Sequence, residues 1–279
     1  MDNGYRKTDI VEDLEAGLAP GADVTRHFPT PRRDILTRVV DWAHGTHIHP
    51  HSHEWWQLVY SESGVISVET EEETWVVPPD RAVWVPAGVV HQVRAPKGGR
   101  NRSLYITSAA ACRWGLPEQC RVVAIPPLVR ELILEFGHLP EEYDEDGPDG
   151  RLAHVILDRL ACLEEVPLNL PWPKDGRALA VARGLEADPA DNRPLEVWAG
   201  EAGASARTLA RLFQRDCGLT FGQWRQRLRL LAALERLGAG ASVTEVALDL
   251  GYDSTSAFIA MFRAALGVTP GAYVRLNGR

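Results

Sequence analysis

The chain of 279 residues lacks any apolar run near the roughly 20 residues that a helix needs to cross a bilayer, which excludes a helical membrane protein. Its N-terminus also lacks the apolar core of a secretory signal, because MDNGYRKTDIVEDLEAG is polar and acidic. The four cysteines lack CxxC pairing, so we expect reduced, mostly buried thiols. These absences favour a protein of the cytoplasm.

Lysine is also scarce, with 3 residues against 27 arginines, which indicates a GC-rich genome and little about function. The charge is uneven along the chain. Residues 193–279 contain 11 arginines and 7 acidic residues, a net of +4, although the whole chain carries −8. A basic C-terminal third on an acidic body is typical of a polyanion-binding module joined to another domain, and chance unevenness is the alternative.

Two patterns divide the chain. From Ile35 to Ile106, short alternating runs are separated by Gly, Pro and acidic turns, which is typical of an all-β sandwich or barrel. After Ser108 the apolar residues recur at helical spacing. We therefore predict an α+β protein of two domains. Its segments are a β domain (1–110), a helical cover or dimerisation segment (111–166), a proline-rich linker (167–176) and an all-α domain (177–279).

Two apolar stripes lie in the predicted helical segment. Their members are Leu128, Leu132 and Phe136 on one helix and Leu152, Ile156, Leu160 and Leu163 on the next. Such stripes either cover the β domain or join two chains in a dimer.

Four of the nine histidines fall in HIHPHSHEWWQ, at His47, His49, His51 and His53. Residues of one parity face one side of a β-strand, so we expect these side chains and Gln57 to line one side. A strand interior cannot bury that many imidazoles without partners, so they either face water or hold something. Neutral imidazole is the commonest protein ligand of several transition metals, which makes a metal ion the leading candidate.

Two segments, GTHIHPHSHEWWQLVYSESG (45–64) and DRAVWVPAGVVHQV (80–93), resemble the paired signature motifs of the cupin fold, a small β-barrel. In metal-binding cupins, two histidines and a carboxylate from the first motif meet one histidine from the second. The metal ligands that the resemblance implies are His51, His53, Gln57 and His91.

Gln57 stands where the cupin pattern has a glutamate, and an amide is a poorer ligand for a hard or redox-active metal. Three imidazoles and one amide oxygen would suit zinc, nickel or copper rather than iron or manganese. The missing carboxylate also argues against an oxidative enzyme. The alternative is a barrel whose histidines bind only an anionic ligand or water. His47 and His49 precede the matched histidine pair His51 and His53, and we interpret them as residues of the barrel mouth.

The C-terminal third contains an internal repeat of helix-turn-helix type. The first copy, RPLEVWAGEAGASARTLARLFQRDCGLT, has a turn at Gly203 and Ser205 as the N-cap of its second helix. The second copy, SVTEVALDLGYDSTSAFIAMFRAALGVTP, has a turn at Gly251 and its second helix from Ser254. Residues 221–238 form the helix that links the two copies.

Two such units in one chain resemble the AraC/XylS family of bacterial transcription regulators, over residues 178–275. In that family each second helix enters a major groove of DNA, which admits an α-helix. The DNA-contacting residues that the resemblance implies are Arg207, Arg211, Gln214, Arg215, Ser254, Thr255 and Ser256. Arg207 and Arg211, on the second helix of the first copy, are the residues expected to read bases. The corresponding helix of the second copy, which begins at Ser254, is nearly uncharged, and we call these two helices the reading helices. We therefore expect the first helix to carry most of the sequence preference; the alternative is an arginine stripe that is only solvated.

Together these features predict a transcription regulator that responds to a small molecule or a metal in the cupin domain. The expected partners are double-stranded DNA, a small-molecule effector, a second copy of the chain and RNA polymerase, with no membrane. An effector could act only through unequal affinity for two arrangements of the DNA modules, and protonation of the histidines near pH 6 would be a secondary input. The alternative functions are a cupin-type metalloenzyme (isomerase or dioxygenase) with a DNA-binding domain and a constitutive architectural DNA binder.

Overall fold

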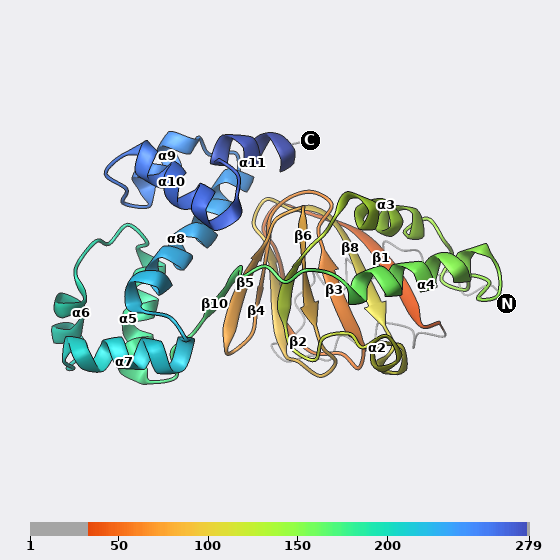
Figure 1. Cartoon of the computed structure of the whole chain (residues 1–279), viewed down its shortest axis with the longest axis horizontal. Coiled ribbons are helices and arrows are strands. Elements are labelled where there is room, and N and C mark those ends of the chain that lie inside the picture. The colour runs from red at the N-terminus through yellow and green to blue at the C-terminus, as the bar shows by residue number, and fades with distance from the viewer. Residues whose placement is uncertain (1–32, 278–279) are drawn as a thin grey trace. The chain divides into compact units, whose positions relative to one another are not determined.

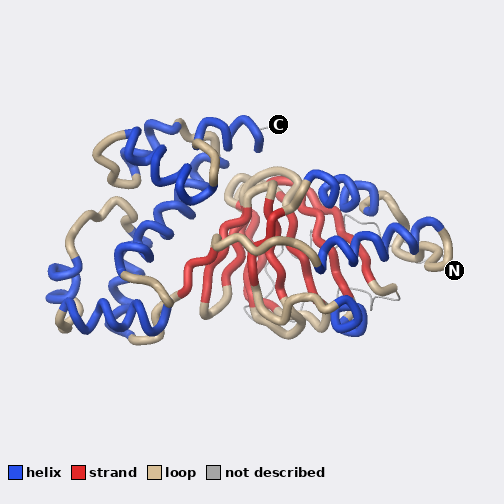
Figure 2. Tube along the Cα trace, viewed as in Figure 1, coloured by secondary structure: helices blue, strands red, loops and turns tan. Residues whose placement is uncertain are grey.

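The computed structural model describes residues 33–277, which divide into two compact units. Unit 1 comprises the described residues up to Thr70 and Val77–Pro167, and unit 2 comprises Glu71–Val76 and the residues from Leu168 onward. Figure 1 labels most elements of both units, and Figure 2 shows strands concentrated in the N-terminal part and helices in the C-terminal part. The prediction of a two-domain α+β chain, with an antiparallel β domain before a helical domain, is confirmed.

The β domain consists of two five-stranded antiparallel sheets. Its strands are β1 (Ile35–Trp42), β2 (Thr46–His51), β3 (Trp56–Tyr60), β4 (Ile66–Glu69), β5 (Glu73–Val77), β6 (Arg81–Val85), β7 (His91–Ala95), β8 (Gly99–Ile106), β9 (Arg121–Ala124) and β10 (Asn169–Pro171). The strand orders are β1-β8-β3-β6-β9 and β10-β5-β4-β7-β2. The turn before β8 passes so close to β1 that a Cβ atom on Gly98 would lie 2.3 Å from the carbonyl oxygen of Trp42, so only glycine fits there.

Three helices of unit 1 lie against the first sheet (Figure 1). They are α2 (Ser108–Trp114), α3 (Pro127–Phe136) and α4 (Pro148–Ala161). Phe136 and Ile156 join Leu58 and Trp84 of the sheet in one buried core cluster. The apolar stripes therefore pack against the sheet for most of their length. Leu128 is the exception, because its side chain is 61% exposed.

Unit 2 contains seven helices among the residues that the structure describes. They are α5 (Gly176–Ala187), α6 (Leu195–Glu201), α7 (Ala206–Cys217), α8 (Phe221–Gly238), α9 (Val243–Asp249), α10 (Thr255–Leu266) and α11 (Pro270–Asn277). The side chain of Ser205 caps α7, as predicted, and the side chain of Ser254 caps α10, which begins one residue later at Thr255. Two helix-turn-helix pairs, α6–α7 and α9–α10, thus flank the linking helix α8, and this arrangement agrees with the predicted duplication.

The segment predicted as a proline-rich linker is held within unit 2. Its strand β10 pairs with β5, and the indole N–H of Trp172 donates to the Thr74 hydroxyl at 3.1 Å. The indole N–H of Trp224 on α8 donates to the carbonyl oxygen of Pro171 at 2.8 Å, and the two indole rings lie 5.8 Å apart. Proline does not prevent this pairing, because Pro171 is the last residue of its strand.

Two features that the sequence analysis addressed are membrane-spanning helices and the state of the cysteines. No helix in the range 33–277 is long and apolar enough to cross a membrane. The four cysteines are free, as expected, but the prediction that most are buried is wrong. Cys112 and Cys162 are exposed, and Cys120 and Cys217 are half-buried.

Candidate functional site

The histidine-rich strand β2 does not keep one parity along its length. Ile48 pairs with Val93 and His51 pairs with His91, so three steps on β2 match two on β7. This register shift is a bulge between Ile48 and His51, a stretch that contains Pro50, whose missing N–H cannot join the ladder. The prediction that all four histidines line one side is therefore wrong.

His47 and His49 share a side of β2 that differs from the side of His51. Their rings lie 4.5 Å apart, and His47 is exposed and donates from Nε2 to Oε1 of Gln92 at 2.9 Å. His51, after the bulge, is buried opposite the buried His91.

Three buried imidazoles converge in unit 1. The side chains of His51, His53 and His91 are 8%, 3% and 1% exposed. Their available ligand atoms all lie within 4.8 Å of one another, and no other such group of histidine, cysteine and acidic side chains occurs in the described part of the chain. The structure thus brings together the three histidines that the cupin resemblance selects.

Each of these rings is oriented by a backbone carbonyl. The Nδ1 atoms of His51, His53 and His91 lie 2.8, 2.6 and 2.9 Å from the carbonyl oxygens of His49, Trp55 and Val89. A carbonyl oxygen can only accept, so Nδ1 carries the hydrogen and the lone pair of each neutral ring is on Nε2. Metal-binding histidines commonly have this arrangement, in which a second group fixes the tautomer.

Burial keeps these imidazoles neutral. It lowers the pKa of His51 to about 4, and it lowers the pKa of His53 and sets that of His91 well below its ordinary value. Neutral imidazole is the form that binds metals. The expectation of a protonation switch near pH 6 is therefore wrong for these three side chains, because their protonation requires a more acid solution.

Gln57 completes the cluster from β3. Its Nε2 donates to the hydroxyls of Ser103 and Tyr105, both at 3.1 Å, and its Oε1 lies 2.9 Å from Nε2 of His53. The Ser103 hydroxyl donates in turn to Oδ1 of Asn101 at 2.9 Å.

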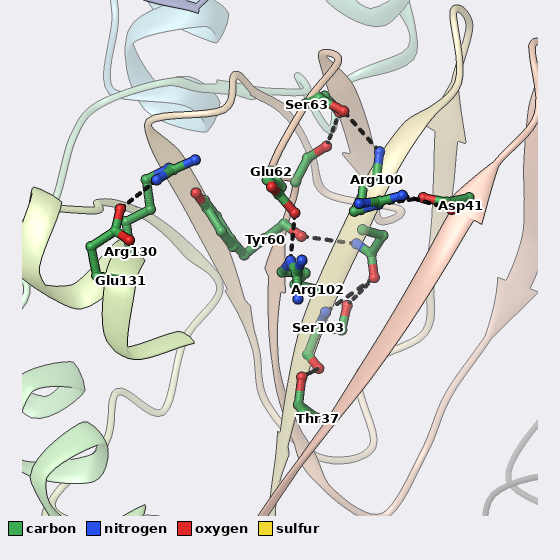
Figure 3. A network of polar contacts seen from close by, with 12 residues as sticks. Thr37, Asp41, Tyr60, Glu62, Ser63, Arg100, Arg102, Ser103, Arg130 and Glu131 are labelled. Carbon is green, nitrogen blue, oxygen red and sulfur yellow. Dashed lines mark hydrogen bonds and ion pairs between the residues drawn. The ribbon is translucent and has the colours of Figure 1, made fainter. Parts of the chain in front are cut away.

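The hydrogen bonds that run from Gln57 through Ser103 to Asn101 end on the neighbouring strand β3. Nδ2 of Asn101 donates to the carbonyl oxygen of Tyr60 at 3.1 Å, and Figure 3 shows Ser103 and Tyr60 within this network. The sequence reasoning missed these supporting residues. The alternation of Asn101, Ser103 and Tyr105 along β8 is the signal that could have found them.

Three polar atoms of the cluster lack a complementary partner. Nε2 of His91 is buried with no hydrogen-bond partner among the described residues. Nε2 of His53 and Oε1 of Gln57 both present lone pairs to each other, given the tautomer set by Trp55. A cation between them, or a reversed amide, would satisfy this pair. Three imidazole nitrogens and one amide oxygen form a donor set that fits zinc, nickel or copper.

A second candidate surface lies on α7. Arg207, Arg211, Gln214 and Arg215 are all exposed, while Leu209, Leu212 and Phe213 on the other side are buried. Arg215 also forms an ion pair with Asp216, with Nε and Oδ1 2.6 Å apart. The remaining three polar side chains are thus presented to solvent by a helix whose opposite side is packed.

The second reading helix, α10, presents a different surface. The Ser254 hydroxyl accepts from the backbone N–H of Ala257, so this side chain serves the cap. Thr255 is half-buried and Ser256 is exposed. Of the three residues predicted here, Ser256 alone is exposed and free of the cap.

The arginines of the linking helix α8 stabilise unit 2 from within. Arg225 donates to the carbonyl oxygen of Arg193, and Arg227 donates to Oδ1 of Asn169 at 3.0 Å. Arg229 is only 8% exposed and donates to the carbonyl oxygen of Pro189 at 2.7 Å. These contacts hold α8 against the neighbouring segments of unit 2.

Comparison with known proteins gives matches in both parts of the chain. Residues 198–276 match the family described as "Helix-turn-helix domain", and residues 38–161 match "AraC-like ligand binding domain". The chain is 37% identical over 224 residues to the HTH-type transcriptional regulator NimR of Escherichia coli strain K12, which covers 80% of this chain and 81% of that protein. It is 38% identical over 127 residues to the HTH-type transcriptional regulator RipA of Corynebacterium glutamicum, covering 46% of this chain and 36% of that protein.

Among solved structures, ToxT from Vibrio cholerae is similar over 88% of this chain and 100% of its own, with 11% identity and a TM-score of 0.38. The curated relatives are named as regulators of transcription, which supports a regulator over the enzyme alternative. With an AraC-like ligand-binding domain before a duplicated helix-turn-helix, and this identity over four fifths of its length, the chain belongs to the AraC family of DNA-binding transcription regulators.

Proposed function

We propose that this regulator holds a divalent transition metal in a cupin-type barrel, and that occupation of this site changes its affinity for DNA. The ligands are His51, His53 and His91 through Nε2 and Gln57 through Oε1. The observation that carries the proposal is the orientation of all three buried rings by backbone carbonyls, which directs three neutral donor atoms to one place.

The uncompensated atoms support the same site. A buried polar atom without a partner costs stability, so the solitary Nε2 of His91 and the facing lone pairs of His53 and Gln57 favour a bound cation.

The sensor function spans segments 1–110 and 111–166, and the DNA-reading function spans 177–279. The protein acts on DNA in the cytoplasm as a homodimer, with RNA polymerase and a small-molecule effector as further partners.

DNA reading depends on α7 and α10. Arg207 and Arg211 read bases, Gln214 and Arg215 contact base edges or phosphates, and Ser254, Thr255 and Ser256 face the backbone or the groove. The exposure of the α7 side chains supports this assignment, because arginine is the side chain that pairs bidentately with guanine. The metal can regulate only if the metal-bound protein prefers one arrangement of these two helices on DNA.

The test begins with purified, tag-free full-length protein loaded with zinc, nickel or copper. We expect about one tightly bound ion per chain by elemental analysis, and its loss in His51→Ala and His91→Ala. The matched control is His47→Ala, since His47 lies on the same strand but outside the cluster. Metal binding that persists in His91→Ala, or that disappears equally in His47→Ala, contradicts the ligand assignment.

The regulatory half of the proposal is tested on DNA flanking the protein's own gene. Protected sites are mapped with metal-loaded and chelator-treated protein, and their affinities are compared at one stated salt concentration. We expect the two forms to differ, and we expect His51→Ala to behave as the chelator-treated form does. Equal affinity in all forms would instead indicate a constitutive DNA binder, and substrate turnover by metal-loaded protein would indicate the enzyme alternative.

A further inference from the structure

The two reading helices are built on the same frame. Helix α7 (Ala206–Cys217) and helix α10 (Thr255–Leu266) both have 12 residues and are separated by 49 positions. Each begins after a capping serine that accepts from the third backbone N–H and ends at a glycine with positive φ, Gly218 or Gly267.

The buried positions of the two helices also correspond. Leu209, Leu212 and Phe213 on α7 match Phe258, Met261 and Phe262 on α10 at the same offset, and all six are buried. Because caps and core agree residue by residue, the exposed positions can be compared at the same offset. Each exposed residue of α7 therefore has an equivalent on α10 that has the same place on the helix.

The exposed faces differ sharply in chemistry. Arg207 corresponds to Ser256, Arg211 to Ala260, Gln214 to Arg263 and Arg215 to Ala264, and all eight residues are exposed. Three arginines are thus replaced by a serine and two alanines. The α10 face is instead a shallow, mostly apolar hollow lined by Ser256, Ile259, Ala260, Arg263, Ala264 and Thr269.

An alanine face cannot form the bidentate pair of an arginine with guanine. Its methyl groups can contact the C5-methyl of thymine, which is the apolar mark that distinguishes A·T pairs in the major groove. Short side chains also let the helix approach base edges closely, since no long side chain intervenes. Arg263, which also lines the hollow and is exposed, can contact a phosphate.

From this comparison we infer that α10 selects thymine through its alanine face, with Ala260 as the central specificity residue, while α7 selects guanine. The preferred DNA site is then asymmetric, with a guanine-containing half under α7 and a thymine-containing half under α10. This inference rests on the proposed role of both helices in DNA reading and adds the base class that each one selects.

The test starts with selection of duplexes from a random-sequence library by the full-length protein at physiological ionic strength. The selection is repeated with Arg211→Ala, and the half-site that loses its guanine preference is assigned to α7. We expect the other half-site to be enriched in thymine. A second half-site with no base preference, or one enriched in guanine, overturns the inference.

Chemical substitution then isolates the methyl group. Deoxyuridine replaces thymidine in the α10 half-site, which keeps base pairing and removes only the C5-methyl. We expect binding to weaken about fourfold for each contacted thymine, the amount that corresponds to one buried methyl-sized group. Equal binding of the uridine and thymidine duplexes refutes the methyl contact.

A gain-of-function variant completes the design. Ala260→Arg creates on α10 the equivalent of Arg211, and we expect its selected half-site to change from thymine to guanine. Ala265→Arg is the matched control, because it adds the same charge at an exposed position outside the reading face, and it should leave base preference unchanged.

If no specific duplex is selected at all, the proposed DNA-reading function fails as well. A specific site without a methyl effect refutes only the thymine inference.

Discussion

Acid should destabilise the metal-free protein through the buried histidines, and His51 gives the clearest magnitude. Its pKa falls from an ordinary 6.5 to about 4 because burial disfavours the charged ring. The unfolded chain therefore binds more protons than the folded chain between these two values, so stability is complete above the unfolded pKa and is lost as the pH falls. At about 1.36 kcal/mol per pKa unit, His51 alone costs about 2 kcal/mol at pH 5 and about 3 kcal/mol at pH 4.

The assay is urea unfolding of chelator-treated protein between pH 7 and pH 5, for the wild type and for His51→Gln. The variant cannot titrate at this position, so it should lose about 2 kcal/mol less than the wild type over this range. His47→Gln is the control, because His47 is exposed on the same strand, and it should follow the wild type. If wild type and His51→Gln lose stability in parallel, burial does not hold the His51 ring neutral and the reasoning fails.

Three further predictions concern Gln57 in the cluster, Trp224 on α8 and Arg211 on α7. Gln57→Glu should tighten zinc binding about tenfold or more in titration calorimetry, because a carboxylate adds negative charge to a neutral donor set; unchanged affinity would remove Gln57 from the ligands. Trp224→Ala should lower the unfolding free energy by about 3–5 kcal/mol, since this fully buried ring packs against Phe213 and donates to Pro171; a loss below about 1 kcal/mol in denaturant titration would contradict that account. Arg211→Ala should cost about 1–3 kcal/mol of discrimination at one guanine, measured by competition between matched and mismatched duplexes; uniform weakening on all sequences would show that it contacts only phosphate.

The helical part of the fold was predictable from the sequence because local signals decide it. Ser205 and Ser254 act as caps within three residues of their partners, and Gly218 and Gly267 end their helices through their own backbone freedom. These interactions are read within one turn of helix. The duplicated frame was therefore visible before any tertiary contact was known.

The details of the histidine site were not predictable in the same way. Parity alone predicted that four histidines lie on one side of β2. The bulge between Ile48 and His51 could not be predicted in this way, because it depends on how β2 pairs with β7, a strand some 40 residues away. The support of Gln57 by Ser103 and Tyr105 likewise needs the register of β3 against β8. The motif spacing predicted which histidines meet, whereas the orientation of their rings required the folded backbone.

The two candidate sites have opposite relations to stability, and this follows from where each one lies. The reading faces of α7 and α10 are exposed, so Arg211 or Ala260 can change with little cost to folding while the buried frame stays the same. The histidine cluster is buried, and Nε2 of His91 lacks a partner among the described residues, so the metal-free fold is strained by the same groups that would bind an ion. A chain selected for stability alone would replace such imidazoles with apolar side chains. The presence of these imidazoles in the interior, each with its own carbonyl, agrees with the proposed metal site, and a bound ion would stabilise the folded state in proportion to its affinity.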